Sequence, residues 1–334
     1  MGKFDLTKPQ VSRVSKTTDG LVMLWHGRNG LGKTPQACRM EKPLYLAFGK
    51  SGLSGLNNVP FFPLMSWADF KSLNNELCNP KKIAQWKEMY QTIIFDEMEI
   101  ASEYCKKYVA NTNGVNKIKE GNGGYGLWGD WKEEWEAEIL KLLGSSFCVI
   151  FITHSEPTDD GMMFPVGDVK RTLPIIMNHA EIIGYVKSNG VDPETGRVRH
   201  SSLEIATTPE WYGRTRNSYF QTTEIEDFTA ENVIKAYYDA LDAQSKAEGV
   251  TSVSYEERQD LFKTEQIPFN DLMDQIATMG NKLIEVAGRD RLVDIVEKTL
   301  GKGNTVSKCS EKQIEALNVI YADIKAALEE QEVA

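Results

Sequence analysis

Short apolar runs recur through most of this chain, and each has the length of a single buried β-strand. Runs that are apolar at consecutive positions, rather than at alternate ones, are typical of strands buried on both faces of a parallel sheet. Segments with helical spacing, such as Trp67–Leu77 and Trp131–Leu143, separate several of them. This alternation predicts a doubly wound α/β domain with a mainly parallel sheet. The predicted strands are Leu21–Trp25, Pro43–Phe48, Phe61–Met65, Thr92–Phe95, Phe147–Thr153, Glu181–Lys187, Ser202–Thr207 and Tyr219–Thr222.

The pattern becomes helical after a polar segment of small side chains at residues 242–258. Ser310 and Gln313 have the spacing of a capping box at the start of a helix. Apolar residues recur at helical spacing in three segments, which are 272–283, 292–300 and 314–328. We therefore expect a core at residues 1–241, a linker at 242–258 and a C-terminal three-helix module at 259–334.

A glycine-rich segment follows the first predicted strand and opens a predicted helix. It matches the phosphate-loop pattern G-x-x-x-x-G-K-[ST] in full, and a chance match is the alternative. Glycines let successive backbone N–H groups point inward as an anion-binding nest, to which the following helix adds its dipole. Pro35 is tolerated because first-turn N–H groups lack partners within the helix. The expected ATP-binding residues are Gly27, Arg28, Asn29, Gly30, Leu31, Gly32, Lys33 and Thr34.

Residues of this loop and of a later strand end suggest magnesium-dependent chemistry. Lys33 is expected to act in catalysis by reaching the β- and γ-phosphates, and Thr34 is expected to ligate Mg²⁺. The fourth predicted strand leads directly into Asp96 and Glu97. Because an apolar strand ending in a carboxylate is the usual second metal-side element, we expect Asp96 to hold the Mg²⁺. Glu97 is placed to orient or deprotonate the attacking water, with Glu99 as a rival and a structural acid as the alternative.

Another predicted strand ends at His154. In this architecture a polar group at that position lies beside the γ-phosphate, so we expect His154 to sense whether that phosphate is present. The alternative is a hydrogen-bonded loop histidine. The other histidines, His26, His179 and His200, show no metal-ligand spacing, and we assign them no chemical role.

The formal net charge of −10 argues against a uniformly basic surface for nucleic acid. Residues 242–334 carry 18 acidic and 11 basic side chains, which leaves a net charge of −7 in this tail. The acidity is therefore concentrated in the helical region, and any DNA contact has to come from local basic loops.

The cysteines and the hydropathy of the chain indicate in which cellular compartment the protein is expected. The five cysteines are widely spaced and fit neither a zinc site nor a disulfide framework. No apolar run approaches the roughly 20 residues of a membrane span. The first residues, Met1–Asp5, lack the apolar stretch of a signal peptide. We therefore expect a cytoplasmic protein without a membrane partner.

Together these motifs, within about residues 20–240, resemble the RecA-like phage ATPases of the Sak-four type, which are single-strand annealing or recombination proteins. Besides the phosphate loop, the resemblance rests on Ile93–Asp96, Gly126–Gly129, Val149–Glu156 and Arg171–Pro174. It implies a RecA-like P-loop core that assembles into rings or filaments and binds single-stranded DNA with ATP.

The resemblance also implies two mobile loops that face DNA, at residues 111–130 and 155–172. The acidic pair Asp159–Asp160 weakens the case for the second loop, and surface segments without a DNA role are the alternative. The expected phosphate contacts are Lys117, Lys119, Lys170 and Arg171, and the expected stacking residues are Tyr125 and Trp128.

Arg214 and Arg216 look like the paired basic residues that RecA-like proteins insert into a neighbouring subunit's ATP site. There they would act in catalysis by stabilising charge on the transferring phosphate, and plain surface arginines are the alternative. The family usually has Lys at the first of these positions. A second departure is that Leu44–Gly49 ends without the glutamate that RecA proper carries there, so the water-activating role falls on Glu97.

The expected function is an ATPase that acts on single-stranded DNA in phage recombination or annealing, with ATP and Mg²⁺ as cofactors and hydrolysis between subunits. One alternative is a nucleotide-switched loader that acts on a protein partner, and another is a kinase-like transferase. We expect the acidic tail to contact a protein, such as a single-strand binding protein, rather than DNA. A packed bundle without a ligand is the alternative for this tail.

Overall fold

The computed structural model describes residues 8–49, 52–261 and 267–333. The segment Met1–Asp5, which is predicted not to be a signal peptide, lies outside the described residues. The chain forms two compact units, one from Val14 to Tyr255 and the other from Glu256 onward with N-terminal residues up to Arg13. Within the described part of the chain, no helix combines the length and hydropathy needed to cross a bilayer.

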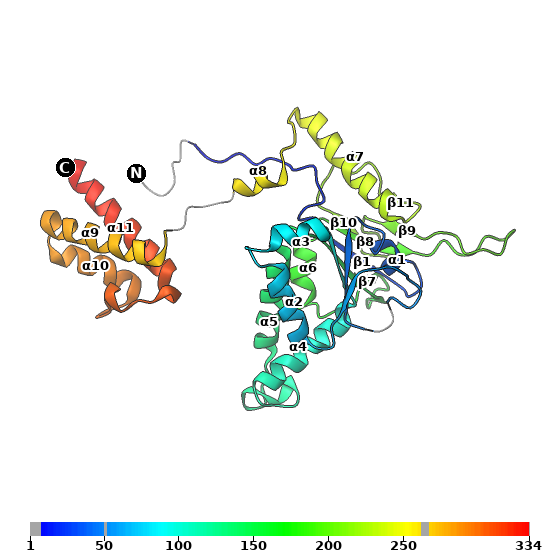
Figure 1. Cartoon of the computed structure of the whole chain (residues 1–334), viewed down its shortest axis with the longest axis horizontal. Coiled ribbons are helices and arrows are strands. Elements are labelled where there is room, and N and C mark those ends of the chain that lie inside the picture. Colours follow the sequence, from blue (N-terminus) through cyan, green and yellow to red (C-terminus); the bar gives the residue numbers. More distant parts are fainter. Residues whose placement is uncertain (1–7, 50–51, 262–266, 334) are drawn as a thin grey trace. The chain divides into compact units, whose positions relative to one another are not determined.

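The larger unit is built on a central sheet whose middle strands are all parallel (Figure 1). The order across the sheet is β11-β9-β8-β1-β5-β4-β2-β3, with β10 beside β8. This confirms the predicted α/β class with a mainly parallel sheet. The parallel strands are β1 (Val22–Gly27), β2 (Pro43–Ala47), β3 (Phe61–Pro63), β4 (Thr92–Asp96), β5 (Cys148–Thr153) and β8 (Ile182–Lys187). The antiparallel strands at one side are β9 (Ser202–Glu204), β10 (Arg214–Thr215) and β11 (Glu224–Ile225).

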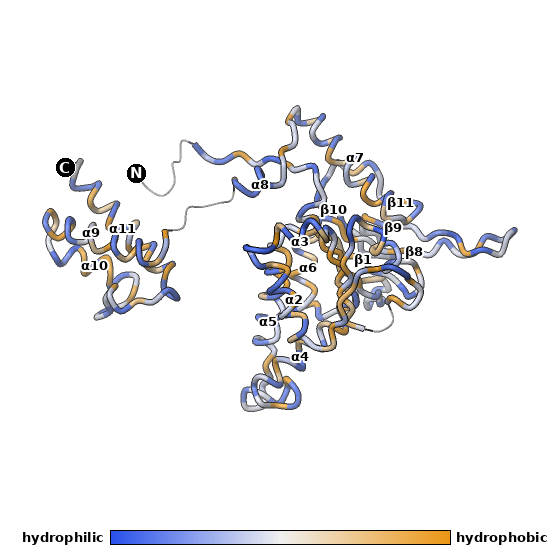
Figure 2. Tube along the Cα trace, in the orientation of Figure 1, coloured by the Kyte–Doolittle hydropathy of each residue, from blue (hydrophilic) through white to orange (hydrophobic). Residues whose placement is uncertain are grey.

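Helices cover both faces of this sheet (Figure 1). Strand side chains alternate between the two faces, so that Leu24 and Phe95 lie in one core while Trp25 and Ile94 lie in the other. Apolar residues accordingly concentrate on the sheet (Figure 2). One face carries α2 (Trp67–Leu77), α3 (Ile83–Met89), α4 (Met98–Thr112), α5 (Trp128–Leu143) and α6 (Leu173–His179). The other carries α1 (Lys33–Ala37) and α7 (Ala230–Glu248).

A buried aromatic cluster packs around the end of β4. The ring centre of Phe95 lies 4.5 Å from that of Phe48, 5.2 Å from that of Phe151 and 6.0 Å from that of Trp135. All four side chains are fully buried. Close packing of this kind leaves little freedom to shift the backbone. Because Phe95 directly precedes Asp96, the cluster holds the candidate metal ligand in place.

The structure differs from the sequence predictions at the end of the core. Tyr219–Thr222 is not a strand, because Asn217 Oδ1 accepts a hydrogen bond from the Tyr219 N–H at 2.8 Å and turns the chain. The first part of the segment predicted as a linker, residues 242–258, instead belongs to α7, because its alanines and long side chains favour a helix. That helix ends at Gly249, whose φ of 64° suits a C-terminal cap.

The smaller unit contains the helical bundle. The turn before its last helix has the predicted capping box, in which the Ser310 N–H donates to Gln313 Oε1 at 3.0 Å. The helix α8 (Tyr255–Asp260) begins at the boundary between the two units. The bundle consists of α9 (Phe269–Ala287), α10 (Arg289–Leu300) and α11 (Ile314–Val333). Its apolar core includes Leu272, Ile276, Leu283, Ile295, Leu317, Ile320 and Ile324. These are the three helical segments that the apolar spacing predicted.

A close backbone approach makes Gly213 a test of packing at the antiparallel side of the sheet. A Cβ atom there would lie 2.8 Å from the Glu204 carbonyl oxygen and 2.9 Å from the Ala206 nitrogen. We expect Gly213→Ala to lower the free energy of unfolding by about 1–3 kcal/mol, because the backbone has to shift. Thermal denaturation measures the change. Gly129→Ala in α5 is the control, since a Cβ there meets nothing within 4 Å and alanine favours the helix. An equal loss in both variants would contradict this account.

Candidate functional site

The phosphate loop joins the carboxyl end of β1 to the start of α1. Gly30 and Gly32 have φ angles of 77° and 90°, which favour glycine over any residue with a side chain. A Cβ at either position meets nothing within 4 Å, so the requirement comes from the backbone and the space beside the loop is open. Because α1 begins at Lys33, its first N–H groups lack helical partners and can bind an anion.

Lys33 is buried across its own loop. Its Nζ donates to the Gly27 carbonyl at 2.7 Å and to the Arg28 carbonyl at 2.8 Å. Burial lowers the pKa of Lys33 to about 8, and the nearby carboxylates of Asp96, Glu99 and Glu97 oppose this shift. The ammonium group therefore lies beside the anion nest with carbonyl partners that a phosphate oxygen can replace.

Thr34 and Asp96 form the candidate magnesium site. The Thr34 hydroxyl donates to Asp96 Oδ2 at 2.6 Å, and the Tyr45 hydroxyl donates to the same oxygen at 3.1 Å. Burial raises the pKa of Asp96 to about 6, while the two hydroxyl bonds act in the opposite direction. Magnesium prefers oxygen ligands, and in phosphate-transfer sites it binds through one or two protein oxygens. The contact between one hydroxyl and one carboxylate oxygen fits this ion.

The order of the strands brings these groups together. β5 lies between β1 and β4, with His26 paired to Thr153 and Phe95 paired to Phe151. The carboxyl ends of parallel strands meet at one edge of a sheet. His154, which follows β5, therefore lies between the phosphate loop and Asp96 along this edge.

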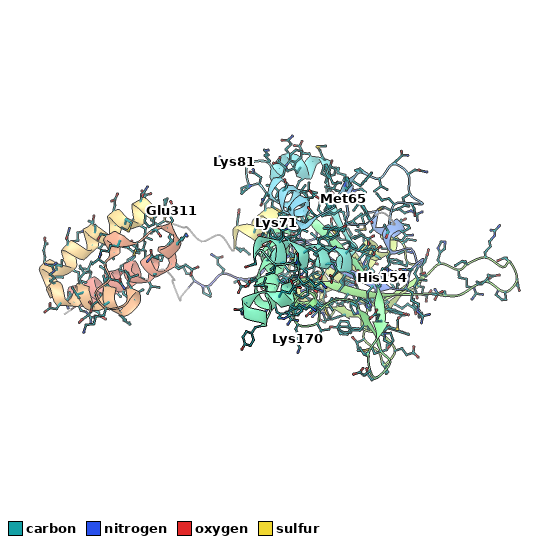
Figure 3. The ribbon with its side chains drawn as sticks, turned by 90° about the horizontal axis from the view of Figure 1, so that it is seen from below. Met65, Lys71, Lys81, His154, Lys170 and Glu311 are labelled. Atoms are coloured by element: carbon teal, nitrogen blue, oxygen red, sulfur yellow. The ribbon has the colours of Figure 1, made fainter. Side chains whose placement is uncertain are left out.

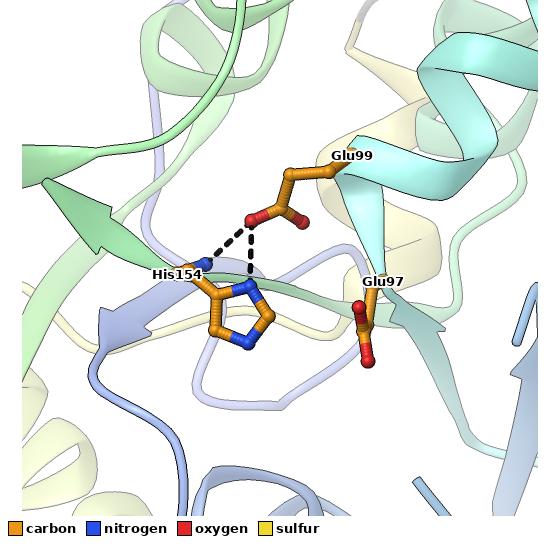
Figure 4. A group of neighbouring side chains, drawn as sticks. All are labelled: Glu97, Glu99 and His154. Atoms are coloured by element: carbon orange, nitrogen blue, oxygen red, sulfur yellow. Dashed lines mark hydrogen bonds and ion pairs between the residues drawn. The ribbon is translucent and has the colours of Figure 1, made fainter. Parts of the chain in front are cut away.

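Glu97, Glu99 and His154 form a cluster at the same edge, and Glu97 faces the space beside the His154 ring (Figure 4). One potential ligand atom from each residue lies within 4.8 Å of the other two. Glu99 Oε1 lies 3.1 Å from His154 Nδ1 and accepts the His154 backbone N–H at 2.8 Å. Burial opposes ionisation of Glu99, but its hydrogen bonds to His154, to its own backbone and to Thr153 together lower the pKa. The bond to Glu99 raises the pKa of His154 against the effect of burial, so the two groups favour an ion pair.

Two contacts in this site were not predicted. Tyr45 lies in β2, and only the pairing of β2 with β4 brings its hydroxyl to Asp96. The sequence predicted Glu99 only as a rival to Glu97, whereas the structure makes it the partner of His154. Its place in the first turn of α4, directly after the candidate metal strand, is the only signal that the sequence carries.

His26 has a packing role, consistent with its having no chemical assignment. Its Nδ1 lies 2.8 Å from Ser155 Oγ, and its Nε2 lies 2.7 Å from the Tyr212 carbonyl oxygen. Burial lowers the pKa of His26 to about 4, so the ring is neutral near pH 7. The histidine therefore fixes the end of β1 just before the phosphate loop.

The two segments expected to face DNA meet at Trp128. The Arg171 guanidinium carbon lies 4.8 Å from the centre of the Trp128 ring, and Arg171 also pairs with Asp168 at 2.9 Å. Both segments contain regular structure. The first has short 3-10 turns at Ile118–Glu120 and Asn122–Gly124, and the second forms the hairpin of β6 (Ser155–Pro157) and β7 (Met163–Pro165).

The other expected DNA contacts lie at the surface of the core. Lys117 and Lys119 are exposed near the far end of the α4–α5 pair, which extends beyond the sheet (Figure 1). Tyr125 in the same region is 85% exposed. Lys170 is exposed as well (Figure 3).

Arg214 and Arg216 lie away from the phosphate loop of their own chain. Arg214 pairs with Ile183 near the start of β8, whereas Gly27 pairs with Val186 near its end. The Arg214 guanidinium donates to the Met177 and Ala180 carbonyls, and Arg216 donates to the Asn178 carbonyl. These carbonyls belong to the last turn of α6 and the residue after it, so the two arginines cap its C-terminus.

Comparison with known proteins identifies the family of this domain. The family model of an AAA domain matches residues 19–217, a range that includes the phosphate loop, Asp96 and His154. The SPbeta prophage-derived uncharacterized protein YorG of Bacillus subtilis (strain 168) is 44% identical over 327 residues, which cover 98% of this chain and 99% of that protein. The chain therefore belongs to the AAA-domain family of P-loop ATPases.

Proposed function

We propose that this protein is a RecA-like, Sak-four-type ATPase that acts on single-stranded DNA in phage recombination or annealing, in the cytoplasm of the host cell. The observation that carries the ATPase part is the direct contact between Thr34 and Asp96 beside a buried Lys33. The prophage origin of the similar YorG protein supports the phage context.

The residues at the phosphate edge have distinct roles in this proposal. Lys33 stabilises charge that develops on the γ-phosphate. Glu97 orients the attacking water and accepts its proton. His154 donates a hydrogen bond to a γ-phosphate oxygen and so distinguishes ATP from ADP. When bound at Thr34 and Asp96, Mg²⁺ supplies positive charge that offsets the charge of the triphosphate.

The DNA part of the proposal rests on exposed aromatic and basic side chains within the two segments that follow β4 and β5. Proteins that bind single strands without base specificity combine stacking platforms with cations that track the backbone. Tyr125 offers an exposed ring, and Lys117, Lys119 and Lys170 offer cations. The negative net charge of the chain favours binding through local basic segments such as these over binding through the whole surface.

Hydrolysis between subunits, within a ring or a filament, is the remaining part of the proposal. Arg214 and Arg216 lie near the opposite edge of the sheet from the phosphate loop, so they can reach only the ATP of a neighbouring copy. There they would exchange the α6 carbonyls for phosphate oxygens, which are stronger acceptors for arginine.

A second candidate function is a nucleotide-switched protein that acts on a protein partner. The observation in its favour is a groove of about 570 Å³ in the acidic helical unit, lined largely by apolar side chains such as Met273, Ile276 and Leu292. An exposed apolar groove is typical of a surface that binds another protein, such as a single-strand binding protein.

Replacing the phosphate-loop lysine tests the ATPase assignment. We expect Lys33→Ala to lower ATP turnover by about 100-fold or more, because a charge-stabilising donor is lost. Phosphate release with Mg·ATP measures the rate. Lys235→Ala removes an exposed lysine of α7 and should leave turnover unchanged. Equal turnover in both variants would refute the assignment.

Adding single-stranded DNA separates the two candidate functions. We expect ATP turnover to rise with DNA, and Tyr125→Ala combined with Lys117→Ala to raise the half-maximal DNA concentration by about tenfold. Tyr125 is so exposed that its removal should not disturb packing. Lys235→Ala again serves as the control. Turnover that does not respond to DNA would favour the protein-partner function.

Mixing two inactive variants tests the arginines. Arg214→Ala combined with Arg216→Ala should abolish turnover, and mixing this protein with Lys33→Ala should restore part of it, because one intact site then forms between unlike subunits. Arg197→Ala, a change at an exposed arginine, should keep its own activity. If the mixture stays inactive while both variants remain folded, the arginines act only as caps of α6.

A further inference from the structure

Among the described residues, the side-chain contacts of Glu99 run through one oxygen atom. Oε1 lies 2.8 Å from Thr153 Oγ1, 2.8 Å from the His154 backbone nitrogen and 3.1 Å from His154 Nδ1. These contacts hold the Nδ1 side of the imidazole against α4. The other ring nitrogen, Nε2, is then left on the far side of the ring from Glu99 (Figure 4). Glu99 therefore determines the orientation in which His154 meets the phosphate edge.

Thr153 connects this pair to the segment that follows β5. Its Oγ1 lies 2.8 Å from Glu99 Oε1 and also 2.8 Å from the Val166 carbonyl oxygen. A hydroxyl has one proton, so Thr153 donates fully to only one of these acceptors at a time. The Val166 N–H in turn donates to the His154 carbonyl at 3.0 Å. A change in the bonds of Glu99 is thus felt directly at Val166.

The same segment continues to the surface expected to bind DNA. Val166 is followed closely by Asp168, which pairs with Arg171, and Arg171 lies over the Trp128 ring. A cavity of about 240 Å³ lies beside this path and is lined by Glu99, Trp131, Val166 and Asp168, among others. This space leaves room for the segment to move relative to α4.

We infer that Glu99 is a positioning residue that orients His154 for the γ-phosphate and, through Thr153 and Val166, links occupancy of the phosphate site to the Arg171–Trp128 contact. The inference rests on the proposed ATPase function. A triphosphate brings negative charge close to Glu97 and Glu99, and it accepts a hydrogen bond from His154 Nε2 while Glu99 holds Nδ1. This bond draws the ring toward the phosphate and weakens the contact between Nδ1 and Glu99. Glu99 Oε1 then attracts the Thr153 proton more strongly, the Val166 carbonyl loses this donor, and the segment up to Arg171 shifts.

The test uses Glu99→Gln in the full chain, with Glu136→Gln in α5 as the matched control, since Glu136 forms a partly exposed ion pair with Lys132. Without DNA, we measure turnover of Mg·ATP and the acrylamide quenching of Trp128 with and without a non-hydrolysable ATP analogue. Trp128 is 37% exposed, so acrylamide can reach it. The difference between the wild type and a Trp128→Phe variant gives the part of the fluorescence that comes from Trp128. We expect Glu99→Gln to lower kcat by about 10- to 100-fold through loss of orientation. KM should stay within about threefold of the wild-type value, because Glu99 is not expected to bind the nucleotide directly.

The nucleotide-induced change in Trp128 quenching should be present in the wild type and in Glu136→Gln, and absent in Glu99→Gln. Two variants of Thr153 provide an independent test if Glu99→Gln fails to fold. Thr153→Val removes the hydroxyl at equal volume and should lose the Trp128 change, whereas Thr153→Ser should retain it.

The outcomes separate the two levels of inference. If the wild type neither binds nor hydrolyses Mg·ATP, the proposed function fails and the role of Glu99 fails with it. If the wild type is active but shows no nucleotide-dependent change at Trp128, the link is overturned and the ATPase stands. The same holds if Glu99→Gln or Thr153→Val keeps both the turnover and the Trp128 change.

Discussion

The parallel pairing of β5 with β1 on one side and β4 on the other is the constraint on which the candidate site depends. The groups at this edge are far apart in sequence, and no local interaction can bring them together. Burial of the strands on both faces sets the pairing, because each strand packs apolar side chains into two separate cores. The phosphate loop, His154 and Asp96 then share one edge as a consequence of register.

Burial and mutual attraction act in opposite directions on the charged groups at this edge. Burial favours the neutral forms of Lys33 and Asp96, while the attraction between Lys33 and its carboxylate neighbours favours the charged ones. Among the described residues, the charged atoms of Lys33 and Asp96 bond to carbonyl and hydroxyl groups, which can be exchanged for other partners. A magnesium-bound triphosphate can therefore enter without leaving a buried charge unpaired, which is the main energetic obstacle to binding in such a site.

The two segments after β4 and β5 connect this edge to the surface. In both cases the chain leaves a strand end at the phosphate site and reaches the region of Trp128 and Arg171. In the proposed function, short elements and hydrogen bonds in these segments would link ATP binding to a DNA-binding surface near Trp128 and Arg171.

The sequence by itself determined the α/β class and most of the strands, because these depend on local hydropathy. From a motif with fixed spacing it also predicted phosphate and metal residues, which stay predictions, and the structure brings Thr34 and Asp96 into contact. It also predicted the helical spacing of α9, α10 and α11 and the capping box at Ser310, which are equally local. The sequence did not predict the turn at Tyr219 or the continuation of α7 past residue 241. At these positions the hydropathy pattern is ambiguous, and side-chain hydrogen bonding and helix propensity decide the structure.

Only the tertiary structure decided the contacts of Tyr45, Glu99 and the two arginines. Tyr45 reaches Asp96 through strand pairing, and Glu99 reaches His154 across two elements that are distant in the chain. The arginines cap α6 because β10 runs antiparallel to β8. Such contacts depend on how strands are ordered and aligned, which hydropathy does not encode, because many orders bury the same apolar residues equally well.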